Sequence, residues 1–273
     1  DYLQNMKTFR FFATLLVITL CAGFTSCGND DDNDNDGGNI ISKGAPVVSI
    51  VRTGNVPEEM DWHFIYSDGK LTSAQGQLIY FGQSDDKENY GISYQGGIQF
   101  TGDYADEISK IETDKNGYIT FIKTTDDTEI NYEYTADGYL KSVTERGTDK
   151  GRDYVNTAII TYSNGCYDKI VETNGNEQTI YTFTASTDEN KNGVLPELIS
   201  ESLGCFGHEF IYYAGLLGKP AQKLVKSMSE SYRYDNVYNN ESYNFSYSFD
   251  ELGNVVLCQY LYDNKNVIVK YGY

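Results

Sequence analysis

A short unit built around a glycine turn recurs along this chain and limits the fold more than any other feature. In one copy, Phe64 and Tyr66 flank a single residue, a polar turn ends in Asp68-Gly69, and the apolar Leu71 follows. Alternation with a period of two places both aromatic side chains on one face of a strand. Asp-Gly and Asn-Gly supply the positive φ angles that tight hairpin turns require. The unit therefore predicts a β-hairpin with one aromatic face.

Copies of this unit extend over most of the chain. Full copies occupy residues 132–140, 160–165 and 245–255, and weaker copies occupy residues 114–119 and 174–175. The turn glycines Gly117, Gly138 and Gly165 are unevenly spaced, which excludes a strict solenoid repeat. We expect an all-β fold, a long antiparallel meander of hairpins that curls into a barrel-like or half-barrel sheet, because curling removes unpaired edges.

One region, at about residues 196–217, departs from the strand pattern and predicts one or two short helices. Pro196 opens a segment that favours a helix as far as Leu203. Residues 206–217 are followed by Gly218-Lys219-Pro220, which is typical of the end of a helix. We expect these helices to cover an open end or the concave face of the sheet.

The N-terminal residues indicate a secretory signal peptide. Lys7 and Arg10 precede a mainly apolar run at residues 11–22. That run is too short for a membrane-spanning helix, which needs about 20 residues. A positive start and a short apolar core are typical of a signal peptide, and we expect translation to start at Met6 and the signal to cover residues 1–26.

A site for lipid attachment follows the signal. Phe24-Thr25-Ser26-Cys27 resembles the lipobox of bacterial lipoproteins of the Bacteroidota type, although Phe24 replaces the usual aliphatic residue. The resemblance implies that Cys27 carries acyl chains, and the alternative is an ordinary signal with an incidental cysteine. Residues 29–39 contain five Asp and no apolar residue, so we expect residues 27–45 to form a charged, extended tether. An acidic tract after the lipidated cysteine also resembles a surface-export signal. Residues 46–273 then form a single β-rich domain.

The charge of the chain limits its partners. Asp and Glu number 40 against 21 Lys and Arg, a net charge of −19. Such a surface repels nucleic acid and anionic lipid head groups, so we expect no nucleic-acid partner. The same surface suits solubility outside a cell, or the binding of cations.

Three cysteines remain beyond the signal and the anchor: Cys166, Cys205 and Cys258. In an oxidising compartment they allow one disulfide with one free thiol, or three buried free thiols. Cys205 and His208 have a Cys-x-x-His spacing, but a zinc site would need the fold to bring the other cysteines to them. We therefore interpret them as buried cysteines and a structural histidine.

Other chemical motifs are incomplete. Residues 188–193 begin like a calcium loop, but Ile199 occupies the twelfth position, where a bidentate Glu is needed. Glu129 and Glu133 would share one strand face, as many exposed acids do. Two histidines and the absence of a G-x-S-x-G elbow argue against nucleophilic catalysis. We expect no catalytic residues, no metal, no cofactor and no enzymatic activity.

A family resemblance rests on motifs in the C-terminal half. Residues 213–220, Lys223-Leu224, residues 247–250 and Gly253-Asn254-Val255 resemble a family of Bacteroidota lipoproteins with a domain of unknown function described as having a porin-like fold. The resemblance covers about residues 47–273 and implies a curved, barrel-like antiparallel sheet without an established activity. The faces expected to point outward are rich in Lys, Glu and Asp, so we expect a soluble domain held by the lipid anchor rather than a membrane barrel.

Two hypotheses of function follow. In the first, the domain is a binding module, anchored in the outer membrane and exposed on the cell surface, with a glycan or a protein as its ligand. Some of the 25 tyrosines would then stack on that ligand, although a structural role in the sheet is favoured for most. In the alternative, the lipoprotein faces the periplasm and its curved sheet holds a lipid or acyl chain around residues 206–217.

Overall fold

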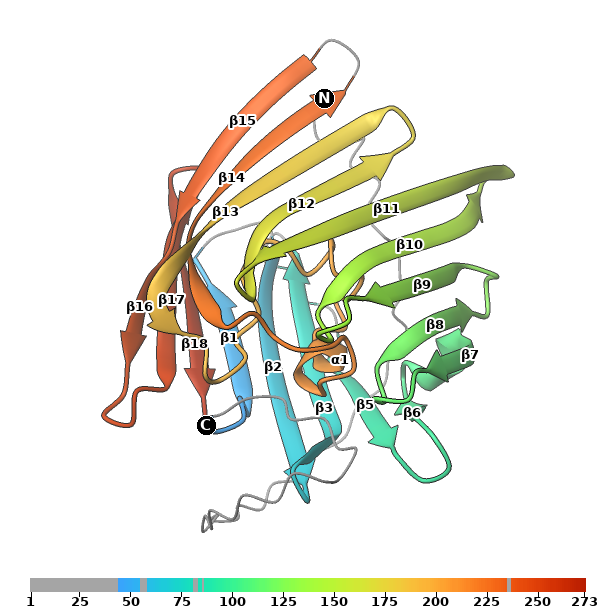
Figure 1. Ribbon diagram of the computed structural model, residues 1–273. Coiled ribbons are helices and arrows are strands. Elements are labelled where there is room, and N and C mark those ends of the chain that lie inside the picture. Colours follow the sequence, from blue (N-terminus) through green and yellow to red (C-terminus); the bar gives the residue numbers. More distant parts are fainter. Residues whose placement is uncertain (1–43, 55–57, 81–82, 85, 235–236) are drawn as a thin grey trace.

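The computed structural model describes residues 44–273 apart from 55–57, 81–82, 85 and 235–236 (Figure 1). The expected signal peptide, the lipidation site Cys27 and nearly all of the tether lie outside the described residues. The described residues form two nine-stranded antiparallel sheets, one α-helix and one short 3-10 helix. The predicted all-β fold is therefore confirmed.

The first sheet has the strand order β16-β17-β18-β1-β2-β3-β5-β6, with β4 paired to β3. Its strands are β1 (Ser49–Thr53), β2 (Glu58–Ser67), β3 (Lys70–Tyr80), β4 (Gln83–Ser84), β5 (Glu88–Ser93), β6 (Gln99–Gly102), β16 (Ser246–Phe249), β17 (Val255–Tyr262) and β18 (Lys265–Gly272). The 3-10 helix η1 (Ala105–Glu107) leads from this sheet to the second.

The second sheet is a simple meander in which every strand from β7 to β15 pairs with its neighbours in sequence. Its strands are β7 (Ile108–Thr113), β8 (Ile119–Thr124), β9 (Glu129–Tyr134), β10 (Leu140–Asp149), β11 (Arg152–Ser163), β12 (Cys166–Asn174), β13 (Glu177–Glu189), β14 (Lys223–Tyr234) and β15 (Val237–Asn244).

The first sheet joins the two ends of the described chain, because β1 pairs with β18 and Ile50 lies opposite Tyr271. The two sheets therefore follow one another in chain order around the molecule (Figure 1). Among the described strands, the hydrogen-bond ladder is interrupted between β6 and β7 and between β15 and β16. The result is a curled, barrel-like arrangement whose two sheets are not joined into one closed ladder.

The predicted hairpin turns are present. Asp68 and Gly69 both have positive φ, 51° and 72°, as a tight two-residue turn requires. The side chain alternation also holds, since Phe64 is 4% exposed and its neighbour Ile65 is 62% exposed. The turn residues and the period-two pattern thus act together to place aromatic side chains inside.

The helix prediction is only partly right. The α-helix α1 (Phe210–Tyr213) is a single turn, much shorter than the expected 206–217. Residues 196–203 form turns rather than a helix, and Leu198 has a left-handed φ of 69°, which a continuous helix does not permit. Among the described residues, no helix is long and apolar enough to cross a membrane.

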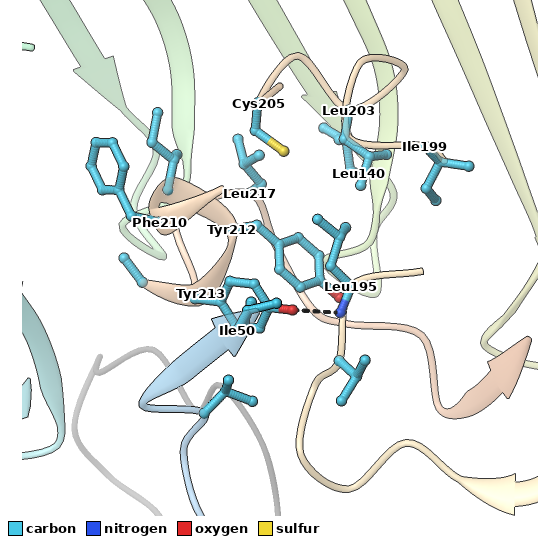
Figure 2. Packing of buried hydrophobic residues seen from close by; sticks show 14 of the residues in the cluster. Ile50, Leu140, Leu195, Ile199, Leu203, Cys205, Phe210, Tyr212, Tyr213 and Leu217 are labelled. Carbon is cyan, nitrogen blue, oxygen red and sulfur yellow. Dashed lines mark hydrogen bonds between the residues drawn. The ribbon is translucent and has the colours of Figure 1, made fainter. Parts of the chain in front are cut away.

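The region that contains α1 fills the space between the two sheets (Figure 1). We call residues 190–218 the plug, and none of them is exposed. Figure 2 shows Leu195 and Tyr213 of the plug joined by a hydrogen bond, with Ile50 of β1 and Leu140 of β10 packed nearby. Because the plug lies between the two sheets and most of its residues are buried, the helical periodicity of a surface helix does not apply to it.

Candidate functional site

Polar contacts tie the plug to both sheets. On the second sheet, the Tyr132 hydroxyl donates to the carbonyl of Gly204 at 3.1 Å, and Ser202 donates to the Glu172 carboxylate. On the first sheet, the amide nitrogen of Asn192 donates to Asn254 at 3.0 Å. These contacts hold the plug against both sheets.

A buried charged group links the plug to the first sheet. Nη1 of Arg52 lies 3.2 Å from Oε2 of Glu197, and the Tyr260 hydroxyl donates to the same oxygen. Burial raises the pKa of Glu197, and Arg52 opposes that shift. Glu209 is 1% exposed, and burial raises the pKa of its carboxyl to about 7. Arg52, Glu197 and Glu209 are all buried in the protein, so we interpret them as part of the packing of the plug.

Beyond the plug, strands β10 to β15 continue toward one end of the molecule (Figure 1). Along these strands the residues on the inner face change from apolar to polar. Cross-strand partners lie on the same face of an antiparallel sheet, so the register identifies this polar surface. We call it the polar band, and it consists of Glu145, Tyr154, Asn156, Glu172, Asn174, Glu177, Thr179, Tyr181, Glu230, Tyr232, Asn239 and Glu241.

The polar band and the hydrophobic core share rows of cross-strand partners on the inner face of the second sheet. Ile170 lies opposite Tyr181, which in turn lies opposite Glu230, so one row passes from core to band. Most band side chains are partly exposed, whereas Ile170 is fully buried. The band contains five glutamates and no Lys, Arg or His. It is thus a concave, acidic and tyrosine-rich surface.

Tyrosine hydroxyls of the band donate to two of its glutamates. Tyr154 donates to Oε1 of Glu145 at 2.8 Å, and Tyr181 donates to Oε2 of Glu172 at 3.5 Å. Burial raises the pKa of Glu145 to about 7, against the opposing effect of the Tyr154 hydrogen bond. A Cβ on Gly147 would meet the Tyr154 hydroxyl oxygen at 2.6 Å. A glycine at this position therefore lets the Tyr154 ring lie close to β10.

Two buried oxygen atoms in the band have no hydrogen-bond donor. They are Oε2 of Glu145 and Oδ1 of Asn156, and these residues lie directly opposite each other on β10 and β11. Glu145 is 4% exposed. A buried acceptor without a donor is unfavourable, so this is a place where a ligand hydroxyl or amine would be stabilised.

Two glutamates face each other at the other side of the band. Glu230 on β14 lies directly opposite Glu241 on β15. Burial raises the pKa of Glu230 to about 7, and the nearby Glu241 and Glu172 add to that shift. Like charges at directly opposite positions destabilise a sheet. Asn239 donates to Oε1 of Glu241 at 3.1 Å, and the Tyr243 hydroxyl donates to Oε2. A positively charged group beside the pair would further reduce the repulsion between the two carboxylates.

The structure also places the residues considered from sequence. Cys166, Cys205 and Cys258 are all free; Cys205 and Cys258 are buried, and Cys166 is half-buried. The sequence allowed either one disulfide with one free thiol or three buried free thiols. The structure has three free thiols, of which two are buried. Within the described part of the chain, no group of three or more His, Cys, Asp or Glu residues is arranged to hold a metal ion. The zinc site that was considered for these cysteines and His208 is therefore not assembled.

The other candidate residues have ordinary partners. Burial lowers the pKa of His208 to about 4, and its ring packs 4.2 Å from that of Tyr104, as expected for a structural histidine. Glu129 and Glu133 share the outer face of β9, and each forms an ion pair with a lysine. Glu197, a carboxylate within the incomplete calcium motif at residues 188–199, forms an ion pair with Arg52.

The polar band was not identified from sequence. Its signal is present in residues 170–183, where alternation puts Glu172, Thr179 and Tyr181 on the same face as Ile170 and Phe183. Polar residues at inward positions of long strands would have indicated a concave surface left open to solvent. Which acids face each other across strands depends on the register, which the sequence pattern alone does not give.

The fold defines a class of curled, antiparallel β-proteins with a plug of their own chain. Residues 64–257 match the model of a family described as a domain of unknown function (DUF4595) with porin-like fold. The chain belongs to this family. Curated proteins give no match to this chain.

Two solved structures are similar to this chain. A porin-like protein from Bacteroides uniformis is similar with a TM-score of 0.62 at 18% sequence identity, covering 84% of this chain and 98% of that one. A porin-like protein from Bacteroides vulgatus matches with a TM-score of 0.46 at 13% identity, covering 84% of this chain and 99% of that one. The first likeness shows a shared porin-like fold.

Proposed function

We propose that this protein is a lipoprotein anchored in the outer membrane by Cys27 and displayed on the cell surface, where it acts as a binding module. The lipobox-like residues 24–27 and the acidic tether that follows them support the anchor and the display. The porin-like family fold is consistent with a location in the outer membrane or cell envelope.

The polar band is the proposed ligand surface, and its exposure is the observation that carries the proposal. Rows that belong to the core elsewhere in the sheet here hold partly exposed tyrosines, asparagines and glutamates. Tyrosine offers a flat apolar ring and a hydrogen-bonding hydroxyl on one rigid side chain, which is why it is common in recognition surfaces. The ligand is a glycan or a protein, and nucleic acid is excluded by charge repulsion.

Binding without catalysis is the activity we propose. The band has carboxylates with raised pKa values, but tyrosine and serine hydroxyls hold Glu145 and Glu172 in fixed positions. No nucleophile and base are paired in it.

The alternative function, a container for a lipid or acyl chain, is less compatible with this arrangement. It needs an apolar concave face that is open to a ligand. The apolar part of the inner face is covered by the plug, and the uncovered part is the acidic polar band. Burying acyl chains against carboxylates would be costly.

A pair of tyrosine variants tests the proposed surface. Tyr232 lies in the polar band, and Tyr238 lies on the outer face of the neighbouring strand, 64% exposed. The full chain, its Tyr232→Ala variant and its Tyr238→Ala variant are purified in detergent and incubated with a saccharide panel and with solubilised envelope proteins. We expect ligand binding that Tyr232→Ala weakens and Tyr238→Ala leaves unchanged. Equal binding by both variants would overturn the assignment of the surface.

A further inference from the structure

The polar band carries an inference about the chemistry of its ligand, which rests on the proposed binding function. All twelve side chains of the band are neutral or acidic. A phosphate, sulfate or carboxylate group on a ligand would meet five glutamates and no cationic side chain there, and the net negative charge would repel it. The band therefore discriminates against anionic ligands before any shape is considered.

The unpartnered acceptors specify what the ligand supplies. Oε2 of Glu145 and Oδ1 of Asn156 are buried, lie on facing positions and have no donor. Glu145 is only 4% exposed. The Tyr154 hydroxyl donates to its other carboxylate oxygen, Oε1. An O–H or N–H group that enters beside Tyr154 would donate to these acceptors. A ligand without donors would leave them unsatisfied.

A pair of opposed glutamates favours a ligand with donor groups at a second, independent place in the band. Glu230 and Glu241 face each other across β14 and β15, and Glu172 is close enough to Glu230 to affect its ionisation. Donor groups or an ammonium group placed between them would reduce their repulsion. Tyr181 and Tyr232 lie among these acids and offer rings on which a sugar face can stack.

We propose that the polar band binds a saccharide chain that is uncharged or carries amino groups, with its hydroxyl or ammonium donors directed at Glu145, Asn156 and the Glu230–Glu241 pair. A saccharide provides many donors along an extended chain, and the band spans six neighbouring strands. Anionic saccharides are excluded by the same residues.

Three groups of probes test the ligand class on the full chain purified in detergent. Dextran and mannan are uncharged, chitosan oligosaccharides carry amines, and heparin and polygalacturonate are anionic. We expect binding of an uncharged or amine-bearing probe and none of the anionic probes. Retention of an anionic probe through the band overturns the inference about ligand class but leaves the binding function in place.

A protein ligand would also distinguish failure of the saccharide inference from failure of the proposed binding function. If Tyr232→Ala abolishes capture of an envelope protein while no saccharide binds, the saccharide inference is wrong and the binding function stands. If no ligand of any kind depends on the band, both are wrong.

Charge-matched variants distinguish recognition by the polar band from electrostatic attraction by the net negative charge of the chain. Glu230→Gln with Glu241→Gln removes two charges from the band, and Asp137→Asn with Glu251→Gln removes two charges from exposed turns elsewhere. We expect the first pair to weaken binding of the amine-bearing probe about tenfold and the second pair to have little effect. Equal effects would mean that chitosan binds by net charge alone, which would contradict a built site.

Glu145→Gln provides a readout that a purely structural role would not give. The new amide can donate to Asn156, so we expect a thermal unfolding temperature that is unchanged or higher. The same variant no longer offers a free carboxylate oxygen, so we expect saccharide binding about tenfold weaker. A change in unfolding temperature with unchanged binding would assign Glu145 a structural role only.

Discussion

Arg52 and Glu197 form a buried ion pair between strand β1 and the plug. Nη1 and Oε2 are 3.2 Å apart, and the two side chains are 7% and 6% exposed. β1 also pairs with β18, so the pair connects the junction of the two chain ends to the segment that fills the interior. We expect this contact to hold the plug in its position between the sheets.

Breaking this pair is expected to destabilise the fold. Removing one partner of a buried pair leaves the other charge uncompensated, which costs roughly 3–5 kcal/mol. Arg52→Gln should therefore lower the free energy of unfolding by about 3 kcal/mol at pH 8, and by less at pH 5, where Glu197 can take up a proton. Denaturant titration measures the change. Lys141→Gln, in an exposed pair with Glu133, is the control and should have almost no effect.

Stability is expected to fall as the pH rises from about 4.5 to about 7. The carboxyl of Glu209 has a pKa raised from 4.5 to about 7 in the fold, chiefly by burial. Between these values the folded state keeps a proton that the unfolded state has released, so stability decreases as pH increases through this window. Glu107, Glu145 and Glu230, with pKa values raised to about 7, act in the same direction.

Thermal unfolding across this pH range measures that dependence. Glu209→Gln cannot ionise, and it should reduce the pH-dependent loss by on the order of 3 kcal/mol. Glu251→Gln, at an exposed turn, should leave the dependence unchanged. An identical pH profile for wild type and Glu209→Gln would show that Glu209 has an ordinary pKa.

Close packing around the single tryptophan gives a spectroscopic test. A Cβ on Gly76 would overlap the ring of Trp62, which lies directly opposite it on β2 and is 1% exposed. Gly76→Ala should destabilise the fold by about 1–3 kcal/mol and shift the tryptophan emission. Ser73→Ala, on the outer face of the same strand, should change neither. Unchanged emission in Gly76→Ala would contradict this packing.

Thiol labelling distinguishes the three cysteines of the domain. Cys166 is half-buried, whereas Cys205 and Cys258 are buried, and burial raises the pKa of both thiols. Since the thiolate is the reactive form, Cys166 should be alkylated first in the native protein, and the others only after unfolding. Peptide mass spectrometry identifies the labelled sites. Early labelling of Cys258 would show that the β16–β18 part of the sheet opens readily.

The hairpins were predictable because their determinants are local. Asp68-Gly69 and Asn164-Gly165 fix their turns through φ angles that few other residues adopt, and the alternating aromatics fix the inward face. The pairing of β1 with β18 was not predictable in this way. It joins segments about 220 residues apart, and nothing in either strand specifies the other.

The plug and the polar band depended on tertiary structure for the same reason. Pro196 and the apolar residues near Leu203 favour a helix locally, but burial between two sheets and the left-handed Leu198 give turns instead. Glu230 and Glu241 are separate, ordinary acids in the sequence. Only the register of β14 and β15 makes them opposite neighbours on a concave face.

Protease shaving of intact cells tests the central claim most directly, which is display of this binding module on the cell surface. The full chain is expressed in Bacteroides cells, and the domain is detected after protease treatment beside a periplasmic control. We predict that the domain is degraded in intact cells while the control is protected, and that a Cys27→Ser variant is lost from the membrane fraction. Protection of the domain until the outer membrane is broken would contradict surface display.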